Sequence, residues 1–480
     1  MNVKYWLFLA LTALQTFAYA DDWKEVVPRQ RLYYTAPNGE RRLLLPSCSG
    51  GPVCTFDAQG NLTQCQLADS KFSFFFQEGE DGGHDGDNPE HDTDEGRNLL
   101  IYLDQGGACW DTSSCIASAA TGVPVYAQAI DRTAIRYAQN TGILADRADN
   151  PFQNWDKVFI PACTGDVLWG SRDYQYDNVG LPGITDEKIT LHHRGFDNVL
   201  AALKWVRKRM GDDKPRKVVV AGSSAGGYGA VTDFAFVKEV WPNAKSYVIA
   251  DAANGVIESG FTQAVINNPD SPWGQQANLP TWIAGIANLP TSSNRYFVDF
   301  FGNLAHYYAG KSANDPRYRS TRFAQYTTEW DVDQVFYYGS MQEAQDPAAM
   351  VELLFSVFLG ESLNPLSPTY PAQNAAYCGW HGLMDQYTND LAYGPNKVDN
   401  YRYYRASGYK HTILTETPPY LLPDGTPIFF NPQGIFYSEN SGGVPFSQWV
   451  RGMLGEPGQS WQNQQCVGDQ CKPPAYVTCN

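Results

Sequence analysis

The sequence predicts an α/β fold, in which helices cover a mostly parallel sheet. Apolar, β-branched runs with the length of buried strands lie at 98–103, 158–161, 216–221 and 247–250. An apolar pattern at helical spacing between Phe196 and Met210 precedes the third run, and a helix-forming stretch at 228–240 follows it. Because parallel strands are joined by crossovers that contain helices, this alternation favours a parallel sheet with helices on both faces.

The first twenty residues have the pattern of a secretory signal peptide. Lys4 is followed by an apolar stretch from Trp6 to Leu14 and by small residues up to Ala20. No later stretch approaches ~20 consecutive apolar residues, so the sequence predicts no membrane span. We therefore expect a secreted protein, extracellular or periplasmic, with a signal peptide at 1–20 and a single elaborated domain at 21–480.

Charge and composition restrict the partners. Acidic residues outnumber Lys and Arg by 51 to 35, a net charge of −16, which argues against nucleic acid as a partner. The stretch 78–95 is rich in acidic residues and glycine and is expected to be a solvated loop. A calcium site there is the alternative, although the spacing does not match an EF-hand.

Ten cysteines follow the signal peptide, an even number that predicts disulfides in an exported chain. Short separations favour the pairs Cys109 with Cys115 and Cys466 with Cys471, while the full connectivity cannot be derived from sequence. Zinc binding is the alternative use of these cysteines, but the chain has no CxxC pairs and no histidines at ligand spacing beside its cysteines, so no metal site is predicted. Asn61 begins an acceptor sequence for N-glycosylation.

The remaining elements follow in chain order. Short aromatic runs between residues 30 and 76 predict antiparallel strands that enter the sheet. Residues 253–320 read as an irregular insertion or lid above the site. Strands are also predicted at 322–328 and 400–406. Trp169 follows the strand at 158–161, on the edge where ligands of parallel sheets collect, so we expect it to line a pocket.

Ser224 is the candidate nucleophile. It lies in Gly222–Gly227, a GxSxG sequence placed directly between a predicted strand and a predicted helix. In α/β-hydrolase folds this nucleophile elbow is a sharp turn that exposes the serine hydroxyl above the sheet. A glycine-rich loop without a function is the alternative for the motif alone, but the strand and helix around it favour the elbow.

A second glycine-rich loop, residues 104–110, follows the strand at 98–103. In serine hydrolases a loop after an early strand supplies part of the oxyanion hole, and the residue after the nucleophile supplies the rest. We therefore assign Gly107, Ala108 and Ala225 to an oxyanion hole. A plain glycine turn is the alternative.

A serine nucleophile needs a histidine as its base, and the chain has seven histidines, which are His84, His91, His192, His193, His306, His381 and His411. In this fold the order along the chain is serine, carboxylate, histidine, so only His381 and His411 leave room for a carboxylate strand. His411 is favoured because it follows the strand at 400–406. For the acid, Asp331 leaves the strand at 322–328, with Asp333, Glu329 and Asp251 as rivals.

Five segments together resemble the pectinacetylesterase and Notum family of exported serine carboxylesterases. They are 103–110, 163–166, 222–227, Trp330-Asp331 and 408–414. The resemblance implies an α/β-hydrolase fold with large loop or lid insertions. It also implies Ser224, Asp331 and His411 as the triad, the oxyanion hole assigned above, and no cofactor or metal. Two tryptophans of these segments, Trp110 and Trp330, are expected to join Trp169 in the substrate pocket.

Two positions depart from the family pattern. Gln105 replaces a glycine and Ala108 replaces a tryptophan, which predicts a wider pocket beside the oxyanion hole. The implied substrate is a small-molecule or polysaccharide ester, above all an O-acetyl ester. A polyester or lipid ester is the alternative, and a non-catalytic carbohydrate-binding protein on a hydrolase scaffold is the alternative from another class. Nothing in the sequence predicts the oligomeric state.

Overall fold

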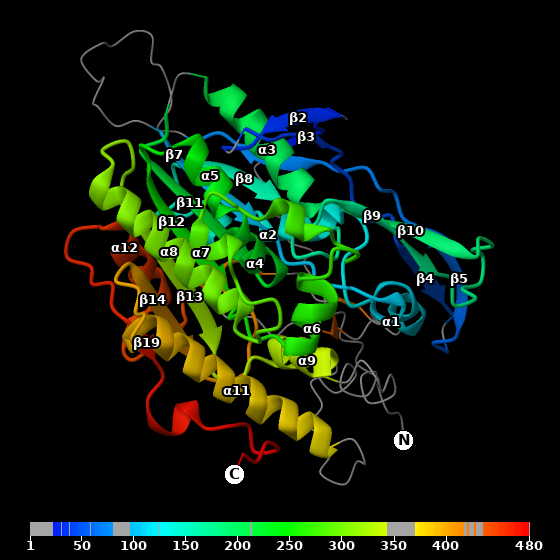
Figure 1. The fold of residues 1–480 in the computed structure, drawn as a ribbon. Helices are drawn as coiled ribbons and strands as arrows, with labels where there is room; N and C mark the ends of the chain where they lie inside the picture. The colour runs from blue at the N-terminus through cyan, green and yellow to red at the C-terminus, as the bar shows by residue number, and fades with distance from the viewer. Residues whose placement is uncertain are drawn as a thin grey trace, which may run out of the picture.

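The computed structural model describes residues 23–79, 97–342, 370–416, 420–421, 427–428 and 435–479, apart from residues 30, 38, 58, 123, 212 and 213. The predicted signal peptide and residues 80–95 of the acidic stretch lie outside the described residues. Within the described residues, a nine-stranded sheet forms the centre of the molecule (Figure 1). Its strands, in spatial order, are β1 (Lys24–Val26), β6 (Phe74–Gln77), β8 (Asp156–Ile160), β7 (Asn98–Leu103), β11 (Lys217–Ser223), β12 (Lys245–Asp251), β13 (Thr321–Thr328), β14 (Tyr401–Ala406) and β19 (Gln464–Gln465).

The sheet is parallel from β8 to β19, and only β6 and β1 add antiparallel pairings at one edge. In the middle of the sheet, Val219 of β11 pairs with Leu100 of β7 and Tyr247 of β12. The predicted α/β-hydrolase-like fold, with a mostly parallel sheet, is confirmed. Because the central strands run in one direction, their carboxyl ends meet at one edge of the sheet.

Helices cover both faces of the sheet, as the alternating strand residues require. Val218 and Val220 pack in one core and Val219 and Ala221 in another, because successive strand side chains point to opposite faces. The first face carries α3 (Gly195–Met210), α4 (Ala225–Thr232), α5 (Phe234–Val240), α8 (Tyr296–Asn314) and α11 (Tyr370–Tyr393), and the second carries α2 (Arg132–Ala138) and α12 (Phe446–Leu454). The predicted helix at 228–240 is interrupted at Asp233, between α4 and α5.

A small β-rich lobe lies beside one end of the main sheet (Figure 1). It contains β4 (Pro52–Phe56), β5 (Leu62–Leu67), β9 (Arg172–Asp177), β10 (Lys188–His193) and α1 (Thr112–Cys115). The prediction for residues 30–76 is confirmed only for β6. The earlier pair, β2 (Leu32–Thr35) and β3 (Arg41–Leu44), forms a hairpin of its own and does not enter the sheet. Two further small sheets are β15 (Tyr420–Leu421) with β16 (Pro427–Ile428) and β17 (Asn440–Ser441) with β18 (Val444–Pro445).

The insertion at 253–320 is more regular than predicted. It contains α6 (Ser259–Phe261), α7 (Ala284–Ala287) and α8, a helix of 19 residues. Phe297, Phe301 and Ala305 recur at a spacing of one helical turn and are buried in α8, so the helix is stabilised by packing on the core. The sequence predicts no helix here, and α8 is therefore a difference from the expected irregular insertion.

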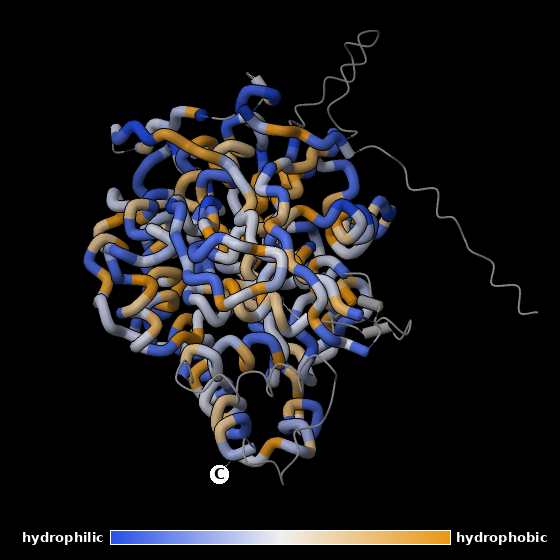
Figure 2. Tube along the Cα trace, turned by 90° about the vertical axis from the view of Figure 1, so that its right-hand side faces the viewer, coloured by the Kyte–Doolittle hydropathy of each residue, from blue (hydrophilic) through white to orange (hydrophobic). Residues whose placement is uncertain are grey.

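All ten cysteines are paired, which confirms the prediction of disulfides. The two predicted local pairs, Cys109–Cys115 and Cys466–Cys471, are both present. The others are Cys48–Cys163, Cys54–Cys65 and Cys378–Cys479. The last of these, Cys378–Cys479, joins the C-terminal segment to α11, and the two lie close together in Figure 1. The C-terminal label stands at the narrow lower end of the molecule in Figure 2. None of the described helices is both long enough and apolar enough to cross a membrane.

Candidate active site

Ser224 lies on the sharp turn between β11 and α4, with φ 53° and ψ −120°. A non-glycine residue adopts this left-handed backbone only when its surroundings enforce it. The neighbouring glycines leave the necessary room, because a Cβ on Gly222 would lie 2.1 Å from the carbonyl oxygen of Gly226, and a Cβ on Gly226 would lie 2.1 Å from that of Leu103. The local structure is therefore the one that the GxSxG motif predicts.

The turn is fixed from the neighbouring strand. The Ser224 amide donates a hydrogen bond of 2.8 Å to the carbonyl oxygen of Asp251, at the end of β12. Ala225 is the first residue of α4, so its amide has no acceptor within the helix. An amide at a helix N-terminus beside a nucleophile is a donor for developing negative charge.

His411 and Asp331 are brought together from distant segments. His411 lies in residues 407–416, the loop after β14 that we call the histidine loop, and Asp331 lies between β13 and α9 (Val332–Gln342). Nδ1 of His411 lies 2.8 Å and 3.0 Å from the two carboxylate oxygens of Asp331, and both side chains are buried. The backbone amides of Asp333 and Gln334 donate to Asp331 Oδ1, which fixes the carboxylate.

Ser224 and His411 line the same cavity. No hydrogen bond joins the two side chains, both of which are among the described residues. Since Nδ1 of His411 is occupied by Asp331, Nε2 is the nitrogen left for another group, and Oδ2 of Asp333 lies 3.7 Å from it. Catalytic hydrogen bonds in an enzyme without substrate are often long and tighten on binding.

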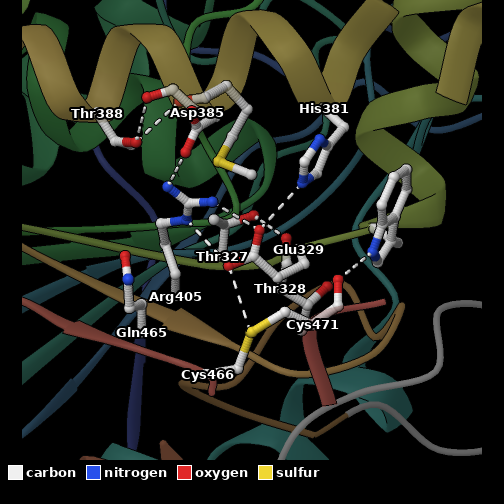
Figure 3. A network of polar contacts seen from close by, with 12 residues as sticks. Thr327, Thr328, Glu329, His381, Asp385, Thr388, Arg405, Gln465, Cys466 and Cys471 are labelled. Atoms are coloured by element: carbon white, nitrogen blue, oxygen red, sulfur yellow. Dashed lines mark hydrogen bonds and ion pairs between the residues drawn. A yellow bond between two sulfur atoms is a disulfide. The ribbon is translucent and has the colours of Figure 1, made fainter. Parts of the chain in front are cut away.

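Among the rival residues, Glu329 and His381 belong to a separate polar network (Figure 3). Oε2 of Glu329 lies 2.6 Å from Nη2 of Arg405 and 3.2 Å from Nε2 of His381. Arg405 also contacts Asp385 of α11, and the disulfide Cys466–Cys471 lies against Glu329. Burial favours the neutral form of Glu329, but the hydrogen bonds from His381 and Arg405 outweigh it and lower its pKa.

In the predicted oxyanion loop, residues 104–110, Ala108 contacts Tyr337, which the sequence analysis did not single out. Gly107 has φ +64°, and a Cβ there would lie 2.0 Å from the carbonyl oxygen of Val125. The Ala108 amide donates to the hydroxyl of Tyr337 on α9 at 3.3 Å, and that hydroxyl donates to Val125. Ala108 therefore reaches an oxyanion only when Tyr337 gives way. No local signal marks Tyr337, because its partners are distant in the chain.

The cavity above Ser224 is mostly apolar and aromatic. It is lined by the oxyanion-hole candidates Gly107, Ala108 and Ala225 and by two of the predicted tryptophans, Trp110 and Trp169. The insertion that was predicted to cover the site contributes Val256, Ile257, Phe261, Ile266, Trp273, Tyr296 and Phe297. The structure does not bring Trp330 to this cavity. Trp330 stacks on His381, with ring centroids 4.1 Å apart, and donates to the carbonyl oxygen of Cys471.

Two clusters of the described residues have side chains close enough together to be considered as metal ligands. One is Cys109, Cys115 and His193, and the other is Glu329, Cys466 and Cys471. In both clusters the cysteines are joined in a disulfide, so their sulfur atoms are not thiolate ligands.

Comparison with known proteins agrees with the resemblance of the motifs. Residues 84–260 match the family model described as pectinacetylesterase. The match contains Ser224 and the oxyanion-hole candidates, while Asp331 and His411 lie beyond it. No curated protein matches the chain. Over residues 84–260, the chain is therefore similar to the pectinacetylesterase family.

Proposed function

We propose that the chain is an exported serine carboxylesterase that hydrolyses O-acyl esters, with acetyl groups on a polysaccharide as the first substrate class. The observation that carries the proposal is the strained Ser224 in the wall of a cavity that is also lined by a histidine bonded to a buried aspartate. The match of residues 84–260 to the pectinacetylesterase family model supports the hydrolysis of acetyl esters. Five disulfides support export to an oxidising compartment.

In the proposed mechanism His411 Nε2 accepts the hydroxyl proton of Ser224 while Oγ attacks the carbonyl carbon of the ester. Asp331 holds the proton on Nδ1 and stabilises the imidazolium that forms. The tetrahedral intermediate collapses, and the alcohol leaves with the proton from His411. Water then attacks the acyl-enzyme in the same way, which releases the carboxylic acid and restores Ser224.

The negative charge of the intermediate would be received by backbone amides. Ala225 has an amide free of any helix acceptor, and Gly107 and Ala108 lie across the same cavity. Each such donor is commonly worth about 3 kcal/mol in the transition state. A substrate that displaces the Tyr337 hydroxyl from Ala108 would complete the oxyanion hole.

The direct test combines turnover and covalent labelling. We expect the wild-type protein to hydrolyse a chromogenic acetate and to be labelled by a phosphonate ester at Ser224, located by peptide mass spectrometry. Absence of both turnover and label would favour the non-catalytic carbohydrate-binding alternative.

The pH dependence follows from the charges around His411. Burial opposes its ionisation, but the carboxylates of Asp331 and Asp333, with a smaller contribution from Asp251, outweigh burial and raise the pKa of His411 to about 9. The imidazole must be neutral to accept a proton, so kcat/KM is expected to rise with pH, to reach half of its maximum near pH 9 and to level off about one pH unit higher. A pH–rate profile of the free enzyme that is already flat at neutral pH would contradict this expectation.

A second substrate class is favoured by one observation, the apolar lining of the cavity. Trp110, Phe261 and Phe297 offer little to a hydrophilic sugar but would bury an acyl chain, and each buried methylene contributes about 0.8 kcal/mol. The net charge of −16 also repels polymers that carry carboxylates. A series of p-nitrophenyl esters distinguishes the two classes. If kcat/KM rises from the acetate to esters with longer acyl chains, the favoured substrate is a lipid ester or a polyester. If it falls, the acetyl ester is favoured.

A further inference from the structure

Asp251, the last residue of β12, forms hydrogen bonds with both the turn that carries Ser224 and the histidine loop that carries His411. Its strand lies between β11, which leads to Ser224, and β13, which leads to Asp331. Its carbonyl oxygen accepts the amide of Ser224 at 2.8 Å, and its carboxylate Oδ2 accepts the hydroxyl of Ser223 at 2.7 Å. Both backbone and side chain of Asp251 therefore hold the nucleophile elbow.

The same carboxylate oxygen also holds the histidine loop. Oδ2 of Asp251 accepts the backbone amides of Ile413 at 2.9 Å and Leu414 at 3.0 Å, two and three residues after His411. Hydrogen bonds to an ionised acceptor are about twice as strong as those between neutral groups. One buried oxygen thus connects the nucleophile segment to the base segment, which are far apart in the sequence.

Further hydrogen bonds at the carboxyl ends of the central strands extend this connection into a network. The hydroxyl of Tyr102, on β7, donates to Ser223 Oγ at 3.1 Å and lies 2.7 Å from the hydroxyl of Thr415 in the histidine loop. The residue after Asp251, Ala252, has a left-handed backbone with φ 54° and lines the cavity. The end of β12 is therefore held in a conformation that a relaxed chain rarely adopts.

We propose that Asp251 is a positioning residue, which sets the separation and angle between Ser224 and His411 by bonding the nucleophile elbow and the histidine loop to one carboxylate oxygen. This inference rests on the proposed function, because it assigns Asp251 a part in the same reaction. Asp251 is distinct from the proposed acid, since its hydrogen bonds go to Ser223, Ile413 and Leu414, whereas Asp331 binds His411 itself.

A carboxylate suits this position better than an amide. Oδ2 faces one hydroxyl and two backbone amides, all of them donors, so the site needs an acceptor without hydrogens. Burial raises the pKa of Asp251 to about 6, with the bonds from Ile413, Ser223 and Leu414 opposing the rise, which leaves the group ionised at neutral pH. An asparagine would fit the volume and could turn its oxygen toward these three donors, but it would remove the charge that strengthens the bonds and would bury its NH₂ group where Oδ1 has no hydrogen-bond partner.

The test is Asp251→Asn, with Asp197→Asn as the matched control. Asp197 is also a buried aspartate with a pKa raised to about 6 and also accepts a backbone amide from a distant segment, that of Leu45, but it lies outside the cavity. We expect Asp251→Asn to lower kcat by about 100-fold, the effect of misplacing reacting groups by about 1 Å, with KM little changed. The rate of phosphonate labelling at Ser224 is expected to fall by a similar factor. Asp197→Asn is expected to keep kcat, KM and the labelling rate close to wild type.

Each outcome decides the proposal. Kinetics are measured on the folded protein over about pH 6 to 10, so that a shifted profile of His411 is not mistaken for a lowered maximum. If Asp251→Asn keeps the wild-type kcat and labelling rate while Ser224→Ala is inactive, the positioning role is wrong and the proposed function stands. If Ser224→Ala is active, the proposed function itself fails.

A second variant covers the case in which Asp251→Asn does not fold. Ser223→Ala removes one of the three donors to Oδ2 and leaves the Asp251 side chain in place. We then expect a smaller loss, with kcat reduced several-fold and KM unchanged. A Ser223→Ala variant with the kcat and labelling rate of the wild type would overturn the connection between the elbow and the histidine loop.

Discussion

Replacing Ser224 by alanine is expected to lower ester turnover by about 10⁵- to 10⁶-fold, because removing the nucleophile of a serine hydrolase leaves only binding and oxyanion stabilisation. The fold should survive the change. Alanine differs from serine only in the hydroxyl, it meets the same backbone strain at φ 53°, and its amide still donates to Asp251. The measurement is kcat with a chromogenic acetate, together with the loss of phosphonate labelling.

Ser246→Ala is the matched control for this variant. Ser246 is a buried serine near the amino end of β12, far from Ser224, where its hydroxyl donates to the carbonyl oxygen of Ala244 and accepts from Nζ of Lys238. We expect Ser246→Ala to cost about 1 to 3 kcal/mol of stability through the two lost hydrogen bonds and to keep the wild-type kcat. Equal turnover by Ser224→Ala and the wild type would remove Ser224 from the mechanism.

Asp331→Asn is expected to lower kcat by about 10⁴-fold, the effect of the same exchange in a serine protease triad. The asparagine side chain can donate to Nδ1 of His411, which places the imidazole proton on Nε2 and leaves no acceptor for the serine hydroxyl. Because the carboxylate also raises the pKa of His411, any residual activity should reach its plateau at lower pH than in the wild type.

The variant Asp333→Asn distinguishes the role of Asp333 from that of Asp331, the two carboxylates that flank His411. Oδ2 of Asp333 lies 3.7 Å from Nε2, on the side of the imidazole that would face substrate, and burial raises the pKa of Asp333 to about 6. We expect a loss much smaller than that of Asp331→Asn, since Asp333 does not hold Nδ1. If Asp333→Asn caused the larger loss and Asp331→Asn remained active, the acid of the triad would be Asp333.

Features that depend on neighbours in the chain were predictable from the sequence. The strand at 98–103 has the predicted bounds, and the Ser224 turn follows β11 as the motif requires, because glycines and small residues determine that geometry locally. The helix α8 was missed although Phe297, Phe301 and Ala305 lie on one face. Glycines and asparagines within it, such as Gly302 and Asn303, weaken the helical signal, and burial against the core stabilises the helix nevertheless.

Contacts between distant segments were not predictable in the same way. Asp331, Asp333 and Glu329 have the same chemistry within five residues, and only their tertiary surroundings distinguish them. Asp331 meets His411, whereas Glu329 is neutralised by Arg405. The roles of Asp251 and Tyr337 likewise depend on partners on other strands and loops. Trp330 shares a motif with Asp331 but lies in the turn after β13 and stacks on His381 of α11, a contact with a distant segment that no local pattern marks.

The order of the strands has a consequence for synthesis on the ribosome. The serine leaves β11, in the middle of the sheet, whereas the histidine follows β14, which pairs with β13 late in the chain. A nascent polypeptide that has emerged only as far as β13 contains Ser224, the proposed nucleophile, but not yet His411, the proposed base. On the proposed function, a protein truncated before β14 would therefore be folded in part but unable to hydrolyse an ester.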